Sequence, residues 1–404
     1  MIKDQIHARI VSRLGDIQDW FRKESEGLFL PFYSSFDIRD SGLKVAPVDA
    51  NIFPAGFNNI CPTDQESAVD VVKNYFIRHY PDFKKVILLT EEHTNNPYYW
   101  DNVNTLGTLL IEAGLDVRLA VPRSLPAPLK VTSAKGAELE VFGAERVGGR
   151  VRAGNLVADL IISNNDFSES YQDWVSGLET PINPPHQLGW HQRQKSAFFQ
   201  EYNQLAEDFA NVVGIDPWLL QVKTTRFAEF DVNDDASRAK LADVVDATMQ
   251  SLREQYRERS LNAEPFVFVK NNSGTYGLGV IQVNSGDEVR NWNYKSRKKM
   301  KAAKGGREIE QVIVQEGIPT VLTDQGATAE PTIYMIGCQL AGGFLRTHES
   351  KGPKENLNSP GAVYKRLCVS DLNVSVEGHP YENVYGWLAK IGFLAIAHEA
   401  RLLD

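Results

Sequence analysis

A glycine-rich loop that follows a lysine carries the clearest chemical signal in this sequence. Lys270 ends an apolar segment, the loop contains Gly274, Gly277 and Gly279, and the β-branched stretch 280–283 comes next. Glycine backbones approach phosphate oxygens closely, and a lysine ammonium neutralises their charge. The stretch after the loop predicts a strand, whereas a helix follows the loop in P-loop and Rossmann motifs. The pattern therefore favours a phosphate-binding hairpin over either motif.

We interpret residues 271–279 as a lid that folds over a triphosphate. Thr275 and Tyr276 lie between the glycines and would contact the nucleotide with them. A plain glycine-rich hairpin turn is the alternative reading, because short motifs are weakly specific.

Two further segments offer contacts to a nucleotide. A short predicted strand at residues 218–222 ends at Lys223, a second candidate phosphate ligand. A buried strand within residues 312–320 would present its backbone edge to an adenine ring. The residues at that edge are Gln315, Glu316, Gly317 and Ile318.

A polar series follows the predicted adenine edge. Glu330 precedes a predicted strand at 332–336, and a hairpin turn at 341–343 leads back to Arg346. A guanidinium there would hold a phosphate or carboxylate through two parallel hydrogen bonds, although a surface salt bridge is equally compatible with the sequence. Asn356 opens a polar loop expected to lie close to a ligand.

Hard oxygen ligands occur near the start of the chain. Asp37 lies in one predicted strand, and Asp49 and Asn51 follow the next. Two carboxylates and an amide oxygen suit Mg²⁺. The alternative is that Asp49 and Asn51 only cap the following loop.

The elements that must position these residues are strands and helices in alternation. Residues 85–121 read as strand, helix and strand, which predicts a parallel sheet. Another strand, 160–163, ends at Asn164 and Asp166, where α/β sheets place ligands. Asn58 and Asn59, in a loop rich in Pro and Gly, are further candidates for substrate binding. The charged stretch 236–259 predicts a long surface helix.

Composition bounds the remaining possibilities. A net charge of −9 argues against general nucleic-acid binding. The three cysteines are widely spaced and are expected to be reduced thiols of a cytoplasmic protein, with Cys61 a buried thiol rather than a nucleophile. The longest apolar stretch near the C-terminus is too short to span a membrane. The basic run 295–306 reads as solvated surface.

The order of these elements resembles the glutathione synthetase branch of the ATP-grasp superfamily over residues 218–367. The resemblance implies ATP as the nucleotide and Mg²⁺ as its metal. Lys223 and Lys270 would be the nucleotide lysines and Glu330 the acidic residue near the ribose. Arg346 would contact an acyl phosphate, and Asn356 would begin the "NL" loop.

One departure from that branch suggests a circular permutation. In the branch, the metal-binding strands follow the "NL" loop, but nothing after Leu367 fits them. The pair formed by Asp37 and Asp49-x-Asn51 fits instead, at the other end of the chain. Eukaryotic glutathione synthetases show a comparable rearrangement. The expected fold is therefore α/β (α+β): an ATP-grasp fold with an N-terminal parallel-sheet domain.

Three segments narrow the resemblance to the smaller bacterial glutamate–cysteine ligase family. They are PFYSSFDIRDSGLKVAPVDANIFPAGFNNI, the NNDFS strand end and GW-x-x-R-x-K-S at 189–196. The family implies an ATP-dependent ligase whose small-molecule substrates are glutamate and cysteine, joined through a γ-glutamyl phosphate in the first step of glutathione biosynthesis. Arg346 and Lys270 would be its catalytic residues.

Other readings stay open. They are glutathione synthetase or a related ligase, a non-catalytic nucleotide-binding protein, and a nicotinamide oxidoreductase, which the missing G-x-G-x-x-G disfavours. The expected division is residues 1–60 with the metal-binding strands, 61–200 for substrate binding and 201–404 for the ATP-grasp lobes. The oligomeric state is left open, a homo-oligomer included.

Overall fold

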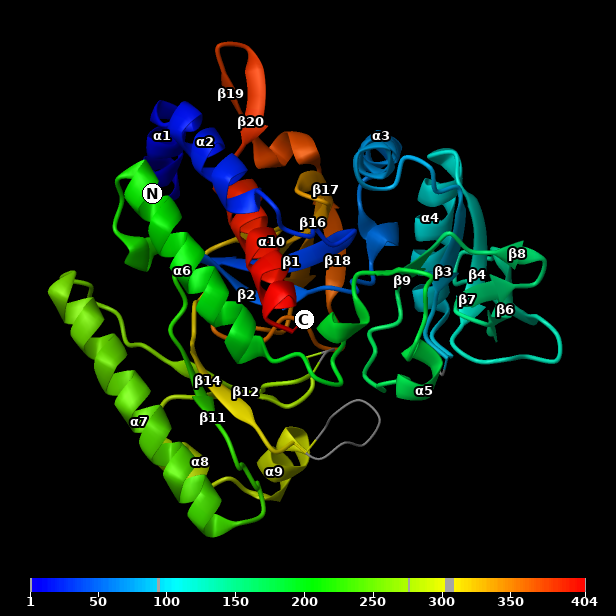
Figure 1. Cartoon of the computed structure of the whole chain (residues 1–404). Helices are drawn as coiled ribbons and strands as arrows, with labels where there is room; N and C mark the ends of the chain where they lie inside the picture. Colours follow the sequence, from blue (N-terminus) through cyan, green and yellow to red (C-terminus); the bar gives the residue numbers. More distant parts are fainter. Residues whose placement is uncertain (1, 93–94, 275–276, 302–308, 404) are drawn as a thin grey trace.

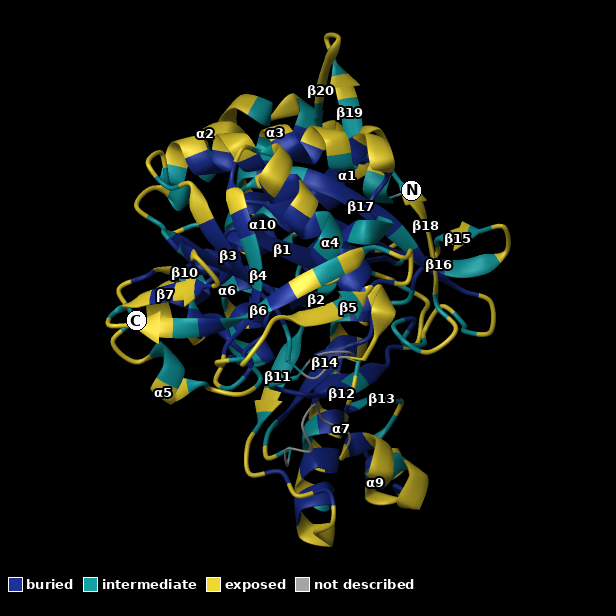
Figure 2. Cartoon of the chain, turned by 90° about the vertical axis from the view of Figure 1, so that its right-hand side faces the viewer, coloured by how far each residue is buried: buried dark blue, intermediate teal, exposed yellow. Residues whose placement is uncertain are grey.

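The computed structural model describes residues 2–92, 95–274, 277–301 and 309–403, and three sheets organise them (Figure 1). A six-stranded sheet lies at the centre, an eight-stranded sheet on one side of it and a four-stranded sheet below. Helices cover the sheets, so the fold class is α+β. Figure 2 shows β12 (Val267–Asn271) and β14 (Val312–Glu316) dark blue, so the two inner strands of the four-stranded sheet are buried, whereas its two outer strands are mostly half-buried.

The central sheet is antiparallel and combines strands from both ends of the chain. Its order is β18-β17-β16-β1-β2, with β15 paired to β16. The strands are β1 (Tyr33–Asp40), β2 (Val45–Asn51), β15 (Thr323–Asp324), β16 (Ala327–Ile336), β17 (Gln339–His348) and β18 (Val363–Leu367). The N-terminal strands therefore complete a sheet that is otherwise C-terminal.

Helices close one face of the central sheet. They are α1 (Ile2–Ser12), α2 (Leu14–Ser25), α6 (Lys195–Val213) and α10 (Val384–Leu403). Phe36 and Ile38 of β1 and Ile333 of β16 point into this helical side and join one buried cluster. Because side chains alternate along a strand, Asp37 and Arg39 point to the other face. That face is polar around Asp37, whereas Tyr33, Tyr334 and Phe344 on the same face belong to a second apolar cluster.

The eight-stranded sheet contains the predicted strand–helix–strand unit. Its order is β10-β9-β3-β4-β6-β7-β8, with β5 paired to β6, and β3 pairs in parallel with β4. The strands are β3 (Lys85–Leu89), β4 (Asp116–Val121), β5 (Leu129–Thr132), β6 (Glu138–Val147), β7 (Arg150–Ala153), β8 (Leu156–Val157), β9 (Leu160–Ser163) and β10 (Ile182–Asn183). Its helices are α3 (Pro62–His79), α4 (Pro97–Glu112) and α5 (Gln172–Val175). The prediction of a parallel strand–helix–strand unit is confirmed, but β5, β7 and β8 pair antiparallel, so the sheet as a whole is mixed.

The four-stranded sheet carries the glycine loop. Its order is β11-β14-β12-β13 and all its pairs are antiparallel. The strands are β11 (Thr224–Phe227), β12 (Val267–Asn271), β13 (Val280–Val283) and β14 (Val312–Glu316). Its helices are α7 (Asp235–Glu258), α8 (Gly286–Arg290) and α9 (Tyr294–Met300). The predicted long helix and the strand after the glycine loop are confirmed.

The remaining elements are short. A hairpin of β19 (Asn373–Val376) and β20 (His379–Glu382) projects from the molecule (Figure 1). The 3-10 helices are η1 (Phe57–Asn59), η2 (His186–Leu188), η3 (Pro217–Leu219) and η5 (Val369–Leu372). No helix of the described residues is both long and apolar enough to cross a membrane.

Two local predictions are wrong. Residues 218–222 do not form a strand, because Asp216 caps the helical turn Pro217–Leu219 through the Trp218 amide. The hairpin does not turn at 341–343 either, since these residues lie inside β17 and the turn falls at Gly337, with φ +54°. A β-carbon on Gly342 would lie 2.3 Å from Ile60 Cγ2, so that glycine serves close packing rather than turning.

Candidate active site

An open cleft lies between the central sheet and the four-stranded sheet. Both sheets, the start of α6 and two loops line it. The lining residues are Asp37, Arg39, Val48, Asp49, Lys195, Phe268, Lys270, Gly274, Gly277, Leu278, Val280, Ile318, Glu330, Asn356 and Asn358. Its walls therefore combine carboxylates, cations and apolar side chains.

The carboxylates come from three neighbouring strands. Asp37 of β1 lies directly opposite Asp49 of β2. On its other side Asp37 faces Thr332 of β16, two residues beyond Glu330. The register of β1 and β2 shifts at this point, which leaves Val48 as an extra residue. Such bulges re-aim nearby groups, and here Lys270 Nζ donates to the Val48 carbonyl oxygen at 2.9 Å.

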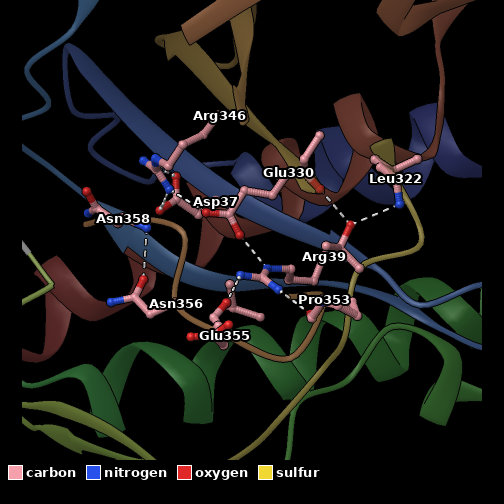
Figure 3. Close-up of polar contacts among 12 residues, drawn as sticks. Asp37, Arg39, Leu322, Glu330, Arg346, Pro353, Glu355, Asn356 and Asn358 are labelled. Atoms are coloured by element: carbon pink, nitrogen blue, oxygen red, sulfur yellow. Dashed lines mark hydrogen bonds and ion pairs between the residues drawn. The ribbon is translucent and has the colours of Figure 1, made fainter. Parts of the chain in front are cut away.

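Two arginines hold Asp37 and Glu330 (Figure 3). Arg346 Nη1 lies 2.8 Å from Asp37 Oδ2 and 2.7 Å from Glu330 Oε1. Arg39 Nε contacts the other Glu330 oxygen, and its terminal nitrogens donate to the carbonyl oxygens of Pro353 and Glu355. The predicted clamp residue Arg346 thus lies beside the predicted metal ligand Asp37.

Burial and ion pairing oppose each other in this network. Burial alone would raise the pKa of Glu330, but Arg39 and Arg346 outweigh it and lower that pKa. Burial also raises the pKa of Asp37, and there it exceeds the opposing effect of Arg346. Burial would lower the pKa of Arg346, yet the two carboxylates raise it. Arg346 is therefore a permanent cation next to two carboxylates that line the cleft, although it is not itself among the described lining residues.

Two lysines interact electrostatically with Asp49. Lys195 Nζ forms an ion pair with Asp49 Oδ1. Burial would raise the pKa of Asp49, but Lys195 and Lys270 lower it. Burial lowers the pKa of Lys270 to about 8 despite the attraction of Asp49. Lys270 also donates to Gln315 Oε1 at 2.6 Å, so it reaches from the glycine-loop strand towards the predicted adenine edge.

The residues present fit a magnesium ion. Asp49 and Asn51 are two residues apart on β2, and Asp37 lies opposite Asp49. Asn51 Oδ1 is buried and has no hydrogen-bond partner among the described residues. A buried acceptor without a donor is costly, and a cation would satisfy it. The donor set of carboxylate and amide oxygens is the one that Mg²⁺ prefers.

The glycine loop borders the cleft where the structure describes it. The amide of Asn271 donates to Gly279 O at 2.9 Å, which closes the hairpin. Gly277 has φ +65°, and a β-carbon there would lie 2.8 Å from Asn358 O. The glycine at this position is therefore required by both conformation and close approach. Thr275 and Tyr276 lie outside the described residues.

A second segment is fastened to the base of this loop. The Lys195 amide donates to Asn272 O at 2.7 Å, and the Ser196 amide donates to Asn272 Oδ1 at 2.9 Å. Ser273 Oγ donates to the carbonyl oxygen of Arg193 at 2.8 Å. The start of α6 and the start of the loop therefore form one unit, which places the Lys195 side chain in the cleft.

The predicted adenine edge is held by its neighbours. The Gly317 amide donates to Phe266 O at 2.8 Å, and Ile318 lines the cleft. The Glu316 carboxylate accepts from buried Lys44 at 2.9 and 3.0 Å and from the Lys223 amide at 3.1 Å. The Glu316 side chain is thus committed to an internal ion pair, and its backbone amide already donates to the Lys223 carbonyl oxygen at 2.8 Å.

Other predicted residues lie elsewhere. Lys223 donates to Ser251 Oγ of α7 at 2.8 Å and is absent from the described lining of the cleft. Asn164 donates to Tyr33 Oη at 2.8 Å and to Pro54 O at 3.0 Å, which makes it a buried structural link.

The last candidates divide between the cleft and other places. Asn356 lines the cleft, and its Oδ1 accepts from the Asn358 amide at 3.0 Å. Asn58 and Asn59 form part of η1, with Asn58 Nδ2 donating to Asn59 Oδ1 at 3.3 Å. Asp166 accepts from the Ser168 amide at 2.9 Å. Asn58, Asn59 and Asp166 are not among the described residues that line the cleft.

Lys195 and Arg39 are site residues for which the sequence predicted no role. Arg39 had a local signal, because it follows Asp37 by two positions in a strand and must share its face. Lys195 lies in the segment GW-x-x-R-x-K-S that carries the family resemblance, but its pairing with Asp49 could not be predicted because 146 residues separate the two.

The fold and the cleft define an α+β protein with a ligand site between two sheets, where cations and carboxylates meet. A model of the glutamate–cysteine ligase family matches residues 7–400. The chain belongs to this family. The predictions of the family, the ligase function and an enzyme are confirmed.

One solved structure is similar over nearly its whole length. It is a protein from Methylobacillus flagellatus KT, provisionally called a gamma-glutamylcysteine synthetase, with 34% sequence identity and a TM-score of 0.89. The match covers 99% of this chain and 96% of that chain. No curated protein matches the chain.

Two other solved structures are much less similar. A glutathione synthetase-like effector from Globodera pallida is 8% identical, with a TM-score of 0.40 and coverage of 90% of this chain and 84% of that one. D-alanyl-alanine synthetase A from Vibrio cholerae is 12% identical, with a TM-score of 0.34 and coverage of 79% and 81%. These values are too low to support an argument about the fold.

Proposed function

We propose that the cleft binds Mg·ATP between the lobes of an ATP-grasp fold, and that the enzyme joins the γ-carboxylate of glutamate to the amine of cysteine. The reaction would pass through a γ-glutamyl phosphate and release ADP and phosphate. The observation that carries this proposal is the meeting of Lys270, Lys195 and Arg346 with Asp37 and Asp49 beside a glycine loop. Phosphoryl transfer depends on such positioned charge.

The strand order supports a circularly permuted grasp. β1 lies between β16 and β2, so the proposed metal strands are joined to the C-terminal sheet although they come first in the chain. The division at residues 60 and 200 belongs to the same proposal. A cytoplasmic location is also proposed, and the three free cysteines are compatible with it.

The protein need not supply a nucleophile, because the substrate carboxylate and amine form the new bonds. Lys270 and Lys195 would neutralise the triphosphate, and Arg346 would hold the negative charge that develops on the transferred phosphoryl group. Asp37, Asp49 and Asn51 would hold Mg²⁺, which when bound supplies further charge neutralisation. For Asp49 to bind the metal, its ion pair with Lys195 must break. The Lys195 ammonium would then bind a phosphate oxygen instead, and the Asp49 carboxylate would be free for the metal.

The glycine loop would exclude water from the acyl phosphate. Gly277 already lies against the backbone of Asn358, so the loop and the polar loop after β17 meet over the cleft. An acyl phosphate hydrolyses when water reaches it, and closure therefore protects the intermediate. Asn356, Asn58, Asn59, Asn164 and Asp166 stay proposals for substrate binding.

The deciding experiment measures phosphate release from Mg·ATP by the purified protein across a matrix of amino-acid pairs. Release that requires both glutamate and cysteine, with γ-glutamylcysteine identified by mass spectrometry, is the expected result. Release only with γ-glutamylcysteine and glycine would assign the later ligation step instead. ATP binding without release from any pair would contradict the catalytic proposal.

A further inference from the structure

Three metal-ligating side chains converge outside the residues that line the cleft. Cys61 and Asp64 lie at the start of α3, and Cys368 follows β18. Their ligand atoms all lie within 4.8 Å of one another, and the residues are 3%, 6% and 5% exposed, respectively. A thiol pair and a carboxylate from segments some 300 residues apart thus share one buried point.

Neighbouring groups orient two of these ligands. Asp64 Oδ2 accepts the Val369 amide at 2.9 Å, which leaves its other carboxylate oxygen available. Cys368 Sγ accepts from Arg366 Nε at 2.6 Å, while the Cys368 amide donates to Asp371 Oδ2 at 2.8 Å. Outer contacts of this kind fix the orientation of metal ligands.

The charges favour a divalent ion. Two thiolates and one carboxylate carry three negative charges, of which a divalent ion would neutralise two and the Arg366 guanidinium the third. Thiolate ligands select zinc-type ions over magnesium. Three protein ligands leave one tetrahedral position for solvent.

We propose that Cys61, Asp64 and Cys368 form a binding site for Zn²⁺, separate from the magnesium site of the cleft. Binding releases the thiol protons and joins the first turn of α3 to the end of the edge strand β18. The ion would therefore fasten the eight-stranded-sheet region to the central sheet.

The test uses the full-length protein and four variants. Wild type, C61S, C368S and D64N are dialysed against Zn²⁺ in excess Mg²⁺, and bound zinc is measured by mass spectrometry. C338S is the matched control, because Cys338 is a third thiol of the same chain and lies outside the cluster. Cadmium binding is followed in parallel by thiolate-to-metal charge-transfer absorption.

We expect about one zinc per chain in wild type and C338S, and loss of zinc and of the cadmium band in C61S and C368S. D64N keeps both thiols and should lower zinc affinity by at least about tenfold. Circular dichroism checks that each variant is folded. A wild type without bound zinc, zinc that D49A removes but C61S retains, or a Cys61–Cys368 disulfide found in place of metal would each overturn the proposal.

Discussion

Arg346 holds Asp37 across an intervening strand, with nitrogen–oxygen distances of 2.8 and 3.2 Å. Arg346 lies on β17 and Asp37 on β1, and β16 separates them in the sheet. The same guanidinium reaches Glu330 on that middle strand. The Arg346 guanidinium of β17 therefore links the carboxylates of Asp37 on β1 and Glu330 on β16.

Replacing Arg346 with Met should damage both stability and turnover. The change leaves Asp37 buried without its cation, which costs about 3–5 kcal/mol of unfolding free energy. Loss of a group that stabilises developing charge should lower kcat by about 10²–10³. Urea unfolding and steady-state kinetics measure the two effects.

Arg152→Met is the matched control for Arg346. Arg152 lies on β7, and its Nη2 is 2.7 Å from Oε2 of Glu145 on β6. The Arg152 side chain is 46% exposed, so its loss should change the unfolding free energy by less than about 1 kcal/mol. Equal effects of the two substitutions would contradict the special role of Arg346.

Lys195 and Lys223 are the two candidates for the lysine that would bind the ATP phosphates together with Lys270. Lys195→Met should raise KM for ATP by at least about tenfold, because its ammonium lies in the cleft against Asp49. Lys223→Met should change KM for ATP by less than about threefold, since its ammonium binds Ser251 of α7. Kinetics of the two variants at matched Mg²⁺ decide between them, and the reverse ranking would restore the sequence-based assignment.

The sequence predicted the local parts of the site better than its long-range parts. The strand–loop–strand around Lys270 was predictable because β-branched residues follow the glycines. The prediction that Asp37 and Asp49 belong to consecutive strands agrees with their direct pairing in the sheet. Asp216 and Pro217 mark the start of a helical turn, so the wrong strand at 218–222 was avoidable.

Other features depend on contacts that no local pattern encodes. Lys195 meets Asp49 only because α6 is fastened to Asn272, far along the chain. Gly342 looks like a turn residue in the sequence, and only the side chain of Ile60 shows why glycine is needed there. Both depend on packing between segments that are distant in the sequence.

The pKa of Lys270 predicts how ATP affinity depends on pH. The pKa is lowered to about 8, so the ammonium of the free enzyme loses its proton as the pH rises through that value. A triphosphate binds the protonated form, and KM for ATP should therefore be flat below pH 8 and rise above it, by up to about tenfold per pH unit. KM is measured from about pH 7.5 to 9.5.

Lys270→Arg provides the control for that profile. A guanidinium stays charged across the range, so the rise in KM should disappear even if the overall rate falls. The same rise in both proteins would show that another group titrates.

Asp49→Ala tests the proposed metal site. We expect turnover to fall by about 10³ or more with the fold intact, because a metal ion at a transferring phosphoryl group contributes several kcal/mol. Asp116→Ala is the control, as Asp116 is 54% exposed at the start of β4. Near-normal turnover of Asp49→Ala at saturating Mg²⁺ would rule out this metal assignment.

The last prediction concerns the buried ion pair between Lys44 and Glu316, a residue of the predicted adenine edge. Lys44 and Glu316 are 3% and 1% exposed, and Lys44 Nζ lies 4.4 Å from the centre of the Trp218 ring. Lys44→Met leaves the Glu316 carboxylate buried without its cation and should cost about 3–5 kcal/mol of unfolding free energy. Adding Glu316→Gln removes that charge, so the double variant should regain more than half of the loss. Urea unfolding of the wild type, both single variants and the double variant measures the coupling. Additive losses would show that the two side chains act independently.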